Sequence, residues 1–254
     1  MSSGDVRAEI RRRYAAAARV VLGGLGPTWS STPSPDPLSL FLEEGPRFGS
    51  CHYSAAELAT IPAAAVRASL GCGSPTTGAP LAAGQIVLDI GCGGGIDSIL
   101  AAKMVEPDGL VIGLDISAEM VELARRNAAA ALTRNAFFVT GLMEELPIAN
   151  QLTDVVIGNS AINLSTAKER TLSELFRVLA PGGRLHIVDL VADDSLSPAD
   201  RMARVVDTNA TAGLFSVSEY DNALRNANFS EVSIAPHHEV ADRVMAAQVT
   251  AIRA

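Results

Sequence analysis

A run of glycines at the end of an apolar stretch constrains this chain more than any other feature. The stretch Gln85–Ile90 is short and mostly apolar, as expected of a strand buried on both faces, and Gly91-Cys92-Gly93-Gly94-Gly95 follows it directly. Glycine lets the backbone turn sharply and lets a ligand approach closely, because no Cβ stands in the way. A loop of this kind between a strand and a helix presents backbone N–H groups to a nucleotide-like cofactor.

A second apolar stretch distinguishes this loop from an ordinary tight turn, which is the alternative that the glycines alone leave open. Leu110–Asp115 reads as a strand and ends in an acid about twenty residues beyond the glycines. At that spacing a carboxylate can accept hydrogen bonds from the hydroxyl groups of a ribose. We therefore predict a site for a cofactor that carries an adenosine, with Asp115 on its ribose.

The order of residues in the loop separates two classes of cofactor. A nicotinamide fingerprint, G-x-G-x-x-G, needs a third glycine to pack the helix on the strand, and Ile96 stands at that position. The form D-I-G-C-G-x-G, here Asp89 to Gly95, resembles the first motif of class I methyltransferases that depend on S-adenosylmethionine (SAM). The resemblance implies SAM as cofactor and S-adenosylhomocysteine as product. A nicotinamide or another nucleotide is the alternative.

Composition and charge exclude several kinds of partner. The 254 residues are 48% hydrophobic and 19% charged, which is typical of a globular α/β domain with an appendage. The net charge of −8 argues against a nucleic-acid partner. There is no apolar run of about 18 residues and no apolar signal-peptide core, so we expect a cytoplasmic protein without a membrane partner. The sequence does not indicate an oligomeric state.

Alternating strands and helices fill most of the chain. This alternation predicts an α/β fold with a Rossmann-like, doubly wound, mostly parallel sheet that helices cover on both faces. Two closing strands near 232–234 and 247–252 should pair with each other, and Ser216 with Glu219 should form the capping box of a helix. The other strands are expected at 85–90, 110–115, 136–140, 154–159 and 185–189, with helices at 97–104, 118–131, 167–179 and in the polar stretch 197–210, and with a turn at Pro181-Gly182-Gly183.

The first 80 residues differ from the rest, and we predict lid helices and a flexible linker there, with the SAM-binding domain over 81–254. Residues 5–21 have apolar side chains at helical spacing, including Tyr14, and five prolines interrupt the stretch 23–50. Two short helices should follow at 54–58 and 62–70, the second with Pro62 in its first turn. The first helix either exposes a solvated charged face or covers the cofactor as a lid, with Tyr14 pointing into the site.

A doubly wound sheet would place the parts of SAM along the carboxyl ends of the strands. Asp89 should order the glycine turn, and Asn159 should border the reactive methyl group. The Leu142-Met143 pair should contact the adenine, with plain core packing as the alternative. The remaining expected contacts are the backbones of Gly91, Cys92 and Gly93 on the methionine part and the ribose, Asp115 on the ribose hydroxyls, and Ile116 beside the adenine.

Several further stretches resemble the arsenite methyltransferases across nearly the whole chain from Tyr53 onward. In that family cysteine thiolates hold a trivalent arsenical, and the resemblance therefore implies a cage of thiolates. The stretches are Ala68-Ser69-Leu70-Gly71-Cys72-Gly73-Ser74-Pro75-Thr76, Ala161-Ile162-Asn163-Leu164-Ser165, Arg177-Val178-Leu179-Ala180-Pro181-Gly182-Gly183-Arg184-Leu185 and His238-Glu239-Val240-Ala241-Asp242.

The cysteines of this chain depart from that family pattern. Cys72 matches one family cysteine, but Ser160 and Ala210 stand where the family has two others. A hydroxyl group is a hard, protonated and poor ligand for As(III), and one thiolate cannot replace three. The other cysteines, Cys51 and Cys92, complete neither a disulfide framework nor a zinc cluster. We therefore expect no metal site and no arsenite methylation.

These observations predict a SAM-dependent transferase that acts on a small organic molecule, as a methyltransferase-like tailoring enzyme of specialised metabolism. An intramolecular ring closure by displacement at a sulfonium is one alternative, and a non-catalytic SAM-binding subunit is another. The predicted catalytic candidates are Tyr14, Ser160 and His238, chosen by position alone.

Overall fold

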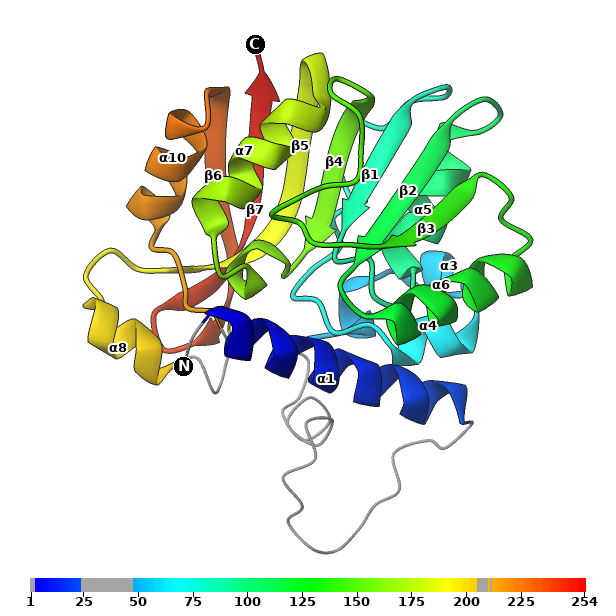
Figure 1. The fold of residues 1–254 in the computed structure, drawn as a ribbon, viewed down its shortest axis with the longest axis horizontal. Helices are drawn as coiled ribbons and strands as arrows, with labels where there is room; N and C mark the ends of the chain where they lie inside the picture. Colours follow the sequence, from blue (N-terminus) through cyan, green and yellow to red (C-terminus); the bar gives the residue numbers. More distant parts are fainter. Residues whose placement is uncertain (1–2, 24–47, 205–209, 211) are drawn as a thin grey trace, which may run out of the picture.

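A single mixed sheet organises the computed structural model, which describes residues 3–23, 48–204, 210 and 212–254. The strand order is β3-β2-β1-β4-β5-β7-β6 (Figure 1). Strands β1 to β5 run parallel, and β7 lies antiparallel between β5 and β6. The strands are β1 Ile86–Ile90, β2 Leu110–Asp115, β3 Ala136–Thr140, β4 Thr153–Asn159, β5 Leu179–Ala192, β6 Phe229–Ala241 and β7 Val244–Arg253.

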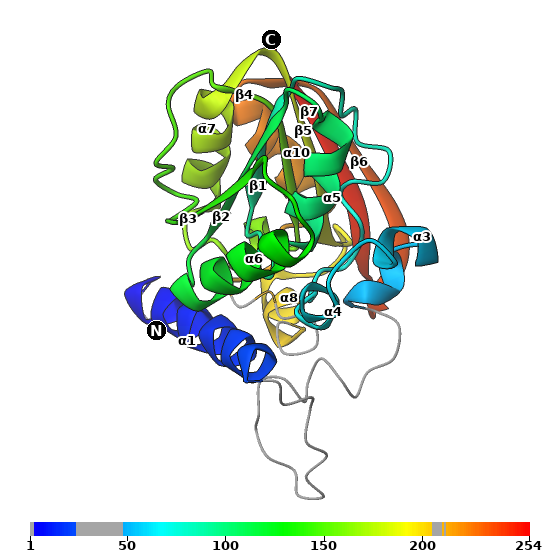
Figure 2. The same ribbon diagram turned by 90° about the vertical axis from the view of Figure 1, so that its right-hand side faces the viewer.

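Helices cover both faces of this sheet, which confirms the predicted doubly wound, mostly parallel architecture. Figure 2 shows α7 and α5 on opposite sides of the strands. The helices are α1 Ser3–Leu22, α3 Ala55–Leu58, α4 Ala63–Arg67, α5 Ile96–Val105, α6 Ala118–Ala130, α7 Lys168–Val178, α8 Pro198–Ala203 and α10 Val217–Asn226, with single 3-10 turns η2 Ser50–His52 and η3 Ile162–Leu164. None of these helices is long and apolar enough to cross a bilayer.

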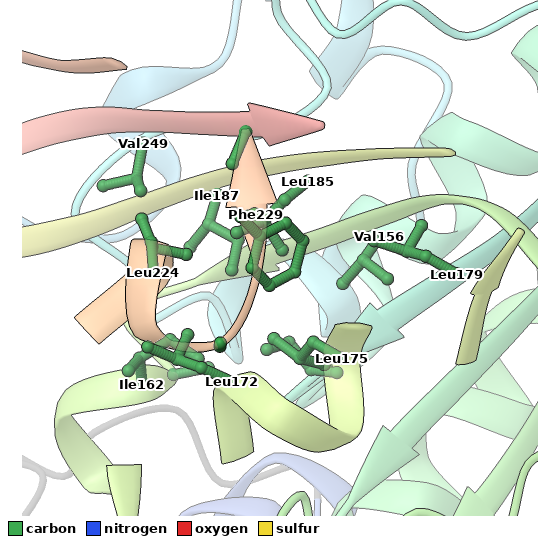
Figure 3. Packing of buried hydrophobic residues seen from close by; sticks show 14 of the residues in the cluster. Val156, Ile162, Leu172, Leu175, Leu179, Leu185, Ile187, Leu224, Phe229 and Val249 are labelled. Carbon is green, nitrogen blue, oxygen red and sulfur yellow. The ribbon is translucent and has the colours of Figure 1, made fainter. Parts of the chain in front are cut away.

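The largest apolar cluster lies between the sheet and the two helices α7 and α10. Leu172 and Leu175 of α7 meet Ile187 of β5 and Leu224 of α10 there, and all four side chains are buried (Figure 3). Helix α7 places Leu172 and Leu175 on one face because residues three apart are neighbours on a helix. This cluster fixes β4 and β5, whose carboxyl ends border the site described below.

Serine caps begin helices α6 and α10. The Ser117 hydroxyl accepts a hydrogen bond from the backbone N–H of Met120 and begins α6. Ser216 and Glu219 form the expected capping box of α10. Each cap satisfies N–H groups that the first turn of a helix cannot pair internally.

Three predicted elements need correction. Pro181-Gly182-Gly183 is a bulge inside β5 instead of a turn before it, because Leu179 already pairs with Thr153 and the pairing resumes at Arg184 with Val155. Pro62 caps α4 instead of lying in its first turn. Strand β6 is far longer than residues 232–234, since an edge strand tolerates Pro236 and the register shifts around it.

Helix α1 runs across the ends of the parallel strands, where it packs on α6 (Figure 1). Its buried residues Ala17, Ala18 and Val21 form an apolar cluster with Met120 and Leu123. Two ion pairs add to this packing: Arg7 lies 3.4 Å from Glu144, and Arg19 lies 2.5 Å from Glu119. The predicted linker at 23–50 falls largely on residues 24–47, outside the described residues. The division of the chain at residue 80 stays a prediction.

The main cluster yields a stability prediction. Leu172→Ala removes a fully buried side chain (0% exposed) from a packed core, so the free energy of unfolding should fall by about 2–5 kcal/mol. Leu132, which is 82% exposed, offers the same chemical change without a cavity, and Leu132→Ala should cost no more than about 0.5 kcal/mol. Urea denaturation of both variants measures the difference. Equal losses would contradict the assigned core.

Candidate functional site

A large cavity lies where the parallel strands end, between the sheet and α1. Its empty volume is about 920 Å³, open solvent at its mouth included. Helix α1 and the segments that follow β1, β2, β3 and β4 supply its wall. The predicted site residues that line it are Tyr14, Gly91, Cys92, Gly93, Asp115, Ile116, Leu142, Met143, Asn159 and Ser160.

The glycine loop presents backbone to this cavity. Gly91, Gly93 and Gly95 have φ values of +67°, +50° and +84°, a region that glycine occupies without strain. A Cβ at Gly93 would meet no atom within 4 Å, so this side of the loop faces open space. The Cys92 N–H donates to the carbonyl of Leu114 at 3.0 Å, which ties the loop to β2.

Asp115, the last residue of β2, holds the loop from the other side. Its Oδ2 accepts from the Gly93 N–H at 3.0 Å, and its Oδ1 accepts from the Ser117 N–H at 2.8 Å. Burial raises the pKa of this carboxyl to about 6, although the backbone hydrogen bonds oppose the shift. The carboxylate thus connects the loop after β1 with the start of α6 at the cavity wall.

Asp89 lies behind the loop and does not line the cavity. Its Oδ2 accepts a 2.5 Å hydrogen bond from the hydroxyl of Ser98 in α5. Burial raises the pKa of Asp89 well above its usual value, and the nearby Asp97 adds to the shift. Asp89 therefore fixes α5 against β1. This contact also fixes the distance between the two ends of the glycine loop.

A buried cluster borders the loop at the opposite end of the cavity from Leu142, and it joins the predicted Asn159 to Tyr53 and Asp97, which the sequence did not predict as site residues. The Tyr53 hydroxyl donates to Asp97, 2.9 Å from Oδ1 and 3.0 Å from Oδ2, and the Asn159 amide donates to the Gly73 carbonyl at 2.6 Å. The Oδ1 atom of Asn159 is buried without a hydrogen-bond partner. Gly71 packs on Asn159 so closely that a Cβ would lie 2.1 Å from Cγ. The position of Asp97 in the first turn after the glycines was the available signal.

The segment after β3 forms the other end of the cavity. Leu142 and Met143 line it, and Ile116 faces it from the end of β2. The neighbouring Glu144 is buried, accepts from the Ser165 hydroxyl at 3.0 Å and pairs with Arg7 of α1. This end therefore combines an apolar wall with a point of attachment for α1.

A smaller second cavity adjoins the first. Its empty volume is about 280 Å³, open solvent included. Four residues line both cavities: Tyr14, Leu70, Ser160 and Leu164. Its remaining wall consists of Phe48, Asn163, Asp189, Leu190 and Ala210. The structure therefore brings together Ser160 and Ala210, the two positions where the resemblance implied thiols.

Cys72 borders the same region. Its backbone N–H donates to the Ser160 hydroxyl at 3.0 Å. Burial, with a smaller contribution from the charge of Asp189, raises the pKa of the Cys72 thiol to about 12. Cys72 is therefore a neutral thiol at pH 7.

His238 is the predicted catalytic candidate that the structure does not bring to the site. It lies on β6, where its ring stacks on His52 with centroids 4.9 Å apart. Neither of the two cavities has His238 among its described lining residues. It was chosen by its position in the sequence alone, which carries no information on the direction of its side chain.

Comparison with known proteins places this geometry in a family. Residues 81–230 match the model of a methyltransferase domain family. An arsenite methyltransferase of Halobacterium salinarum is 39% identical over 74% of this chain and 48% of its own length. A demethylmenaquinone methyltransferase of Symbiobacterium thermophilum is 41% identical over 40% of this chain and 41% of its own length. The crystal structure of an arsenic(III) S-adenosylmethionine methyltransferase from Chlamydomonas reinhardtii superposes with a TM-score of 0.65 at 30% identity, over 78% of this chain and 71% of that one.

The chain spans 48% of the length of the Halobacterium enzyme and 44% of an arsenite methyltransferase of Aquipseudomonas alcaligenes, about half in each case. The family model itself covers more than half of the 254 residues. The chain therefore belongs to the methyltransferase domain family, and it resembles the arsenite methyltransferases.

Proposed function

We propose that this chain transfers a methyl group from SAM to a small organic acceptor held in the second cavity, as a tailoring reaction of specialised metabolism, and that it does not methylate arsenite. The observation that carries the proposal is the second cavity itself, which adjoins the cofactor cavity and has Ser160 and Ala210 in its wall. Its other side chains include Phe48, Leu164 and Leu190, which suit an organic molecule.

The residues of the large cavity fit SAM. The unpartnered Oδ1 of Asn159, with the Asp97 carboxylate beside it, suits the ammonium group of the methionine part. The open face of Gly93 suits a closely approaching ligand, and Asp115 suits the ribose hydroxyls. Leu142 and Met143, with Ile116, would then hold the adenine.

When bound, SAM supplies an electrophilic methyl group, so that the lone pair of an acceptor forms the new bond while the electron pair of the broken C–S bond stays on sulfur. The main task of the chain is then to hold the acceptor in line, at about 3–3.5 Å from the reacting carbon. Tyr14 and Ser160 line both cavities and can orient an acceptor between them. Burial raises the pKa of Tyr14 to about 12, so its hydroxyl stays a hydrogen-bond donor at pH 7.

The second cavity offers few of the ligands that As(III) needs. Soft thiolates are the ligands that As(III) requires, and Cys72 is a buried neutral thiol. Ser160 offers a hydroxyl and Ala210 a methyl group. A SAM-binding subunit without catalysis would have no use for a second cavity next to the cofactor, so the pair of cavities favours an enzyme.

Asp115→Ala should lower the affinity for SAM at least about tenfold, because charge-assisted hydrogen bonds contribute about 1.5–3 kcal/mol. Asp108 is exposed in the turn before β2, so Asp108→Ala removes the same charge away from the cavity and should leave the affinity unchanged. Calorimetric titration with SAM measures both variants. An Asp115→Ala protein that binds SAM like the wild type would refute the assigned ribose contact.

The raised pKa of Asp115 predicts a pH dependence. Hydroxyl groups that donate to this carboxylate favour its charged form and lower its pKa from about 6. SAM binding near pH 6 should therefore release protons, and SAM affinity should rise between about pH 5 and about pH 7. Titration in two buffers of different ionisation enthalpy counts the protons, and Asp115→Asn should reduce the count. Uptake of protons on SAM binding would contradict this prediction.

The substrate prediction separates arsenite from organic acceptors. Purified protein with SAM, arsenite and a thiol reductant should yield no methylarsenicals, whereas a panel of small organic acceptors should yield S-adenosylhomocysteine in mass spectra. Turnover of arsenite at about 1 s⁻¹ or faster, an ordinary enzymatic rate, would overturn the proposal.

A gain-of-function variant serves as the control. Ser160→Cys combined with Ala210→Cys adds two thiols to the cavity beside Cys72 and should create binding of arsenite, measured as protection of the thiols from a thiol-reactive dye. In either single variant, arsenite should protect the thiols less, because fewer thiols are available to bind it.

A further inference from the structure

Asp189 is a buried carboxylate in the wall of the second cavity that no step above uses. It lies in β5 and is 0% exposed. Its Oδ1 accepts from the Asn163 amide at 3.0 Å and from the Leu190 N–H at 2.8 Å, so this oxygen is fully engaged. The Asn163 amide group is engaged in turn, because it also donates to the Leu190 carbonyl and accepts from the Phe215 N–H.

The other oxygen of Asp189 accepts one hydrogen bond of ordinary length and one long hydrogen bond. Oδ2 accepts from the Ile162 N–H at 3.0 Å, but its second donor, the Tyr220 hydroxyl, stands at 3.5 Å. Hydrogen bonds of O–H groups to oxygen are normally about 2.5–3.0 Å long. A ligand group that donates at ordinary distance would therefore bind Oδ2 better than Tyr220 does.

Within the part of the chain that the structure describes, Asp189 also has no cationic partner. Among the described residues, no lysine or arginine forms an ion pair with it within 4.0 Å. Lys168, the cation whose charge it influences, donates instead to the carbonyl of Ala212 at 2.8 Å. The other titratable groups around Asp189 are the neutral hydroxyls of Tyr14 and Tyr220 and the neutral thiol of Cys72. A buried anion without a counter-ion is costly, and a cationic ligand removes that cost.

We propose that the acceptor in the second cavity is a small amine, bound through an N–H group to Oδ2 of Asp189, and that this carboxylate excludes anionic acceptors. The proposal rests on the proposed function, whose acceptor class it names. The apolar wall from Leu164 and Leu190 suits the hydrocarbon part of such an amine.

Asp189 also offers a destination for a proton. An ammonium group must lose a proton before its nitrogen can form a bond to carbon, and transfer of that proton to Oδ2 leaves a neutral amine and a neutral carboxyl group. Burial raises the pKa of Asp189 to about 6 and would lower the pKa of a buried ammonium group. The two pKa values therefore become more similar, which favours transfer of the proton. Methyl transfer then puts the positive charge of the sulfonium on the methylated nitrogen, and the carboxyl group becomes a carboxylate again when its proton is released to solvent.

Binding of matched probes tests this inference without requiring turnover. The probes are 2-phenylethylamine, 2-phenylethanol and phenylacetate, titrated at pH 8 into protein saturated with S-adenosylhomocysteine. The amine should bind at least about tenfold more tightly than phenylacetate, because opposite charges attract strongly where water is excluded. At pH 5, where Asp189 is protonated, the gap should shrink.

Two variants locate the effect. Asp189→Asn should remove the preference for the amine, and its unchanged affinity for S-adenosylhomocysteine would show an intact fold. Asp193→Asn makes the same change in net charge on an exposed residue just beyond β5 and should preserve the preference. If Asp189→Asn fails to fold, the comparison of probes on the wild-type protein still decides. Equal or tighter binding of phenylacetate at pH 8, failure of the amine to bind, or a preference unchanged in Asp189→Asn would overturn the inference, whereas failure of S-adenosylhomocysteine to bind would instead count against the proposed function.

Discussion

The site depends on burying carboxylates at one edge of a sheet and meeting each of them with hydrogen-bond donors. Asp89, Asp97, Asp115 and Asp189 all lie at the carboxyl end of the parallel strands or one turn beyond, and all four are buried. A carboxylate without donors would be expelled or protonated there. For each aspartate, at least one hydrogen-bond donor belongs to another element or loop of the fold. The hydrogen bonds that satisfy these charges therefore also fix the elements relative to one another.

This constraint explains why the loop after β1 has a defined shape although it is mostly glycine. Asp115 holds the Gly93 amide from β2, and Asp89 holds α5 through Ser98. The loop between these two anchor points keeps its N–H groups and its open face toward the cavity. The glycine loop is therefore a defined binding surface, because hydrogen bonds from neighbouring elements restrict the backbone that glycine alone would leave flexible.

Local patterns in the sequence were sufficient for the parts of the fold that depend on near neighbours. The bounds of β2 and β3 follow from apolar spacing, and the capping box at Ser216 follows from its cap residues. The hydrogen bond from Tyr53 to Asp97 joins residues 44 positions apart, and no local pattern encodes it.

The same limit applies to the candidate site. The sequence predicted Asp115 and Asn159 at the cavity because strand ends gather at one edge of a parallel sheet. It did not predict Asp189, since a strand residue reveals its orientation only when both neighbouring strands are placed. His238 was chosen by its position in the sequence alone, and the fold puts it on an edge strand beside His52.

Helix α1 has a kinetic consequence for the two cavities. Its residue Tyr14 lines both of them, and its ion pairs with Glu144 and Glu119 attach it to the segments that follow β3 and β2. A movement of α1 therefore opens both cavities together. Exchange of the spent cofactor and departure of the product would share one barrier, so the rate of turnover would follow the undocking of a single helix and would increase with ionic strength as its ion pairs are screened.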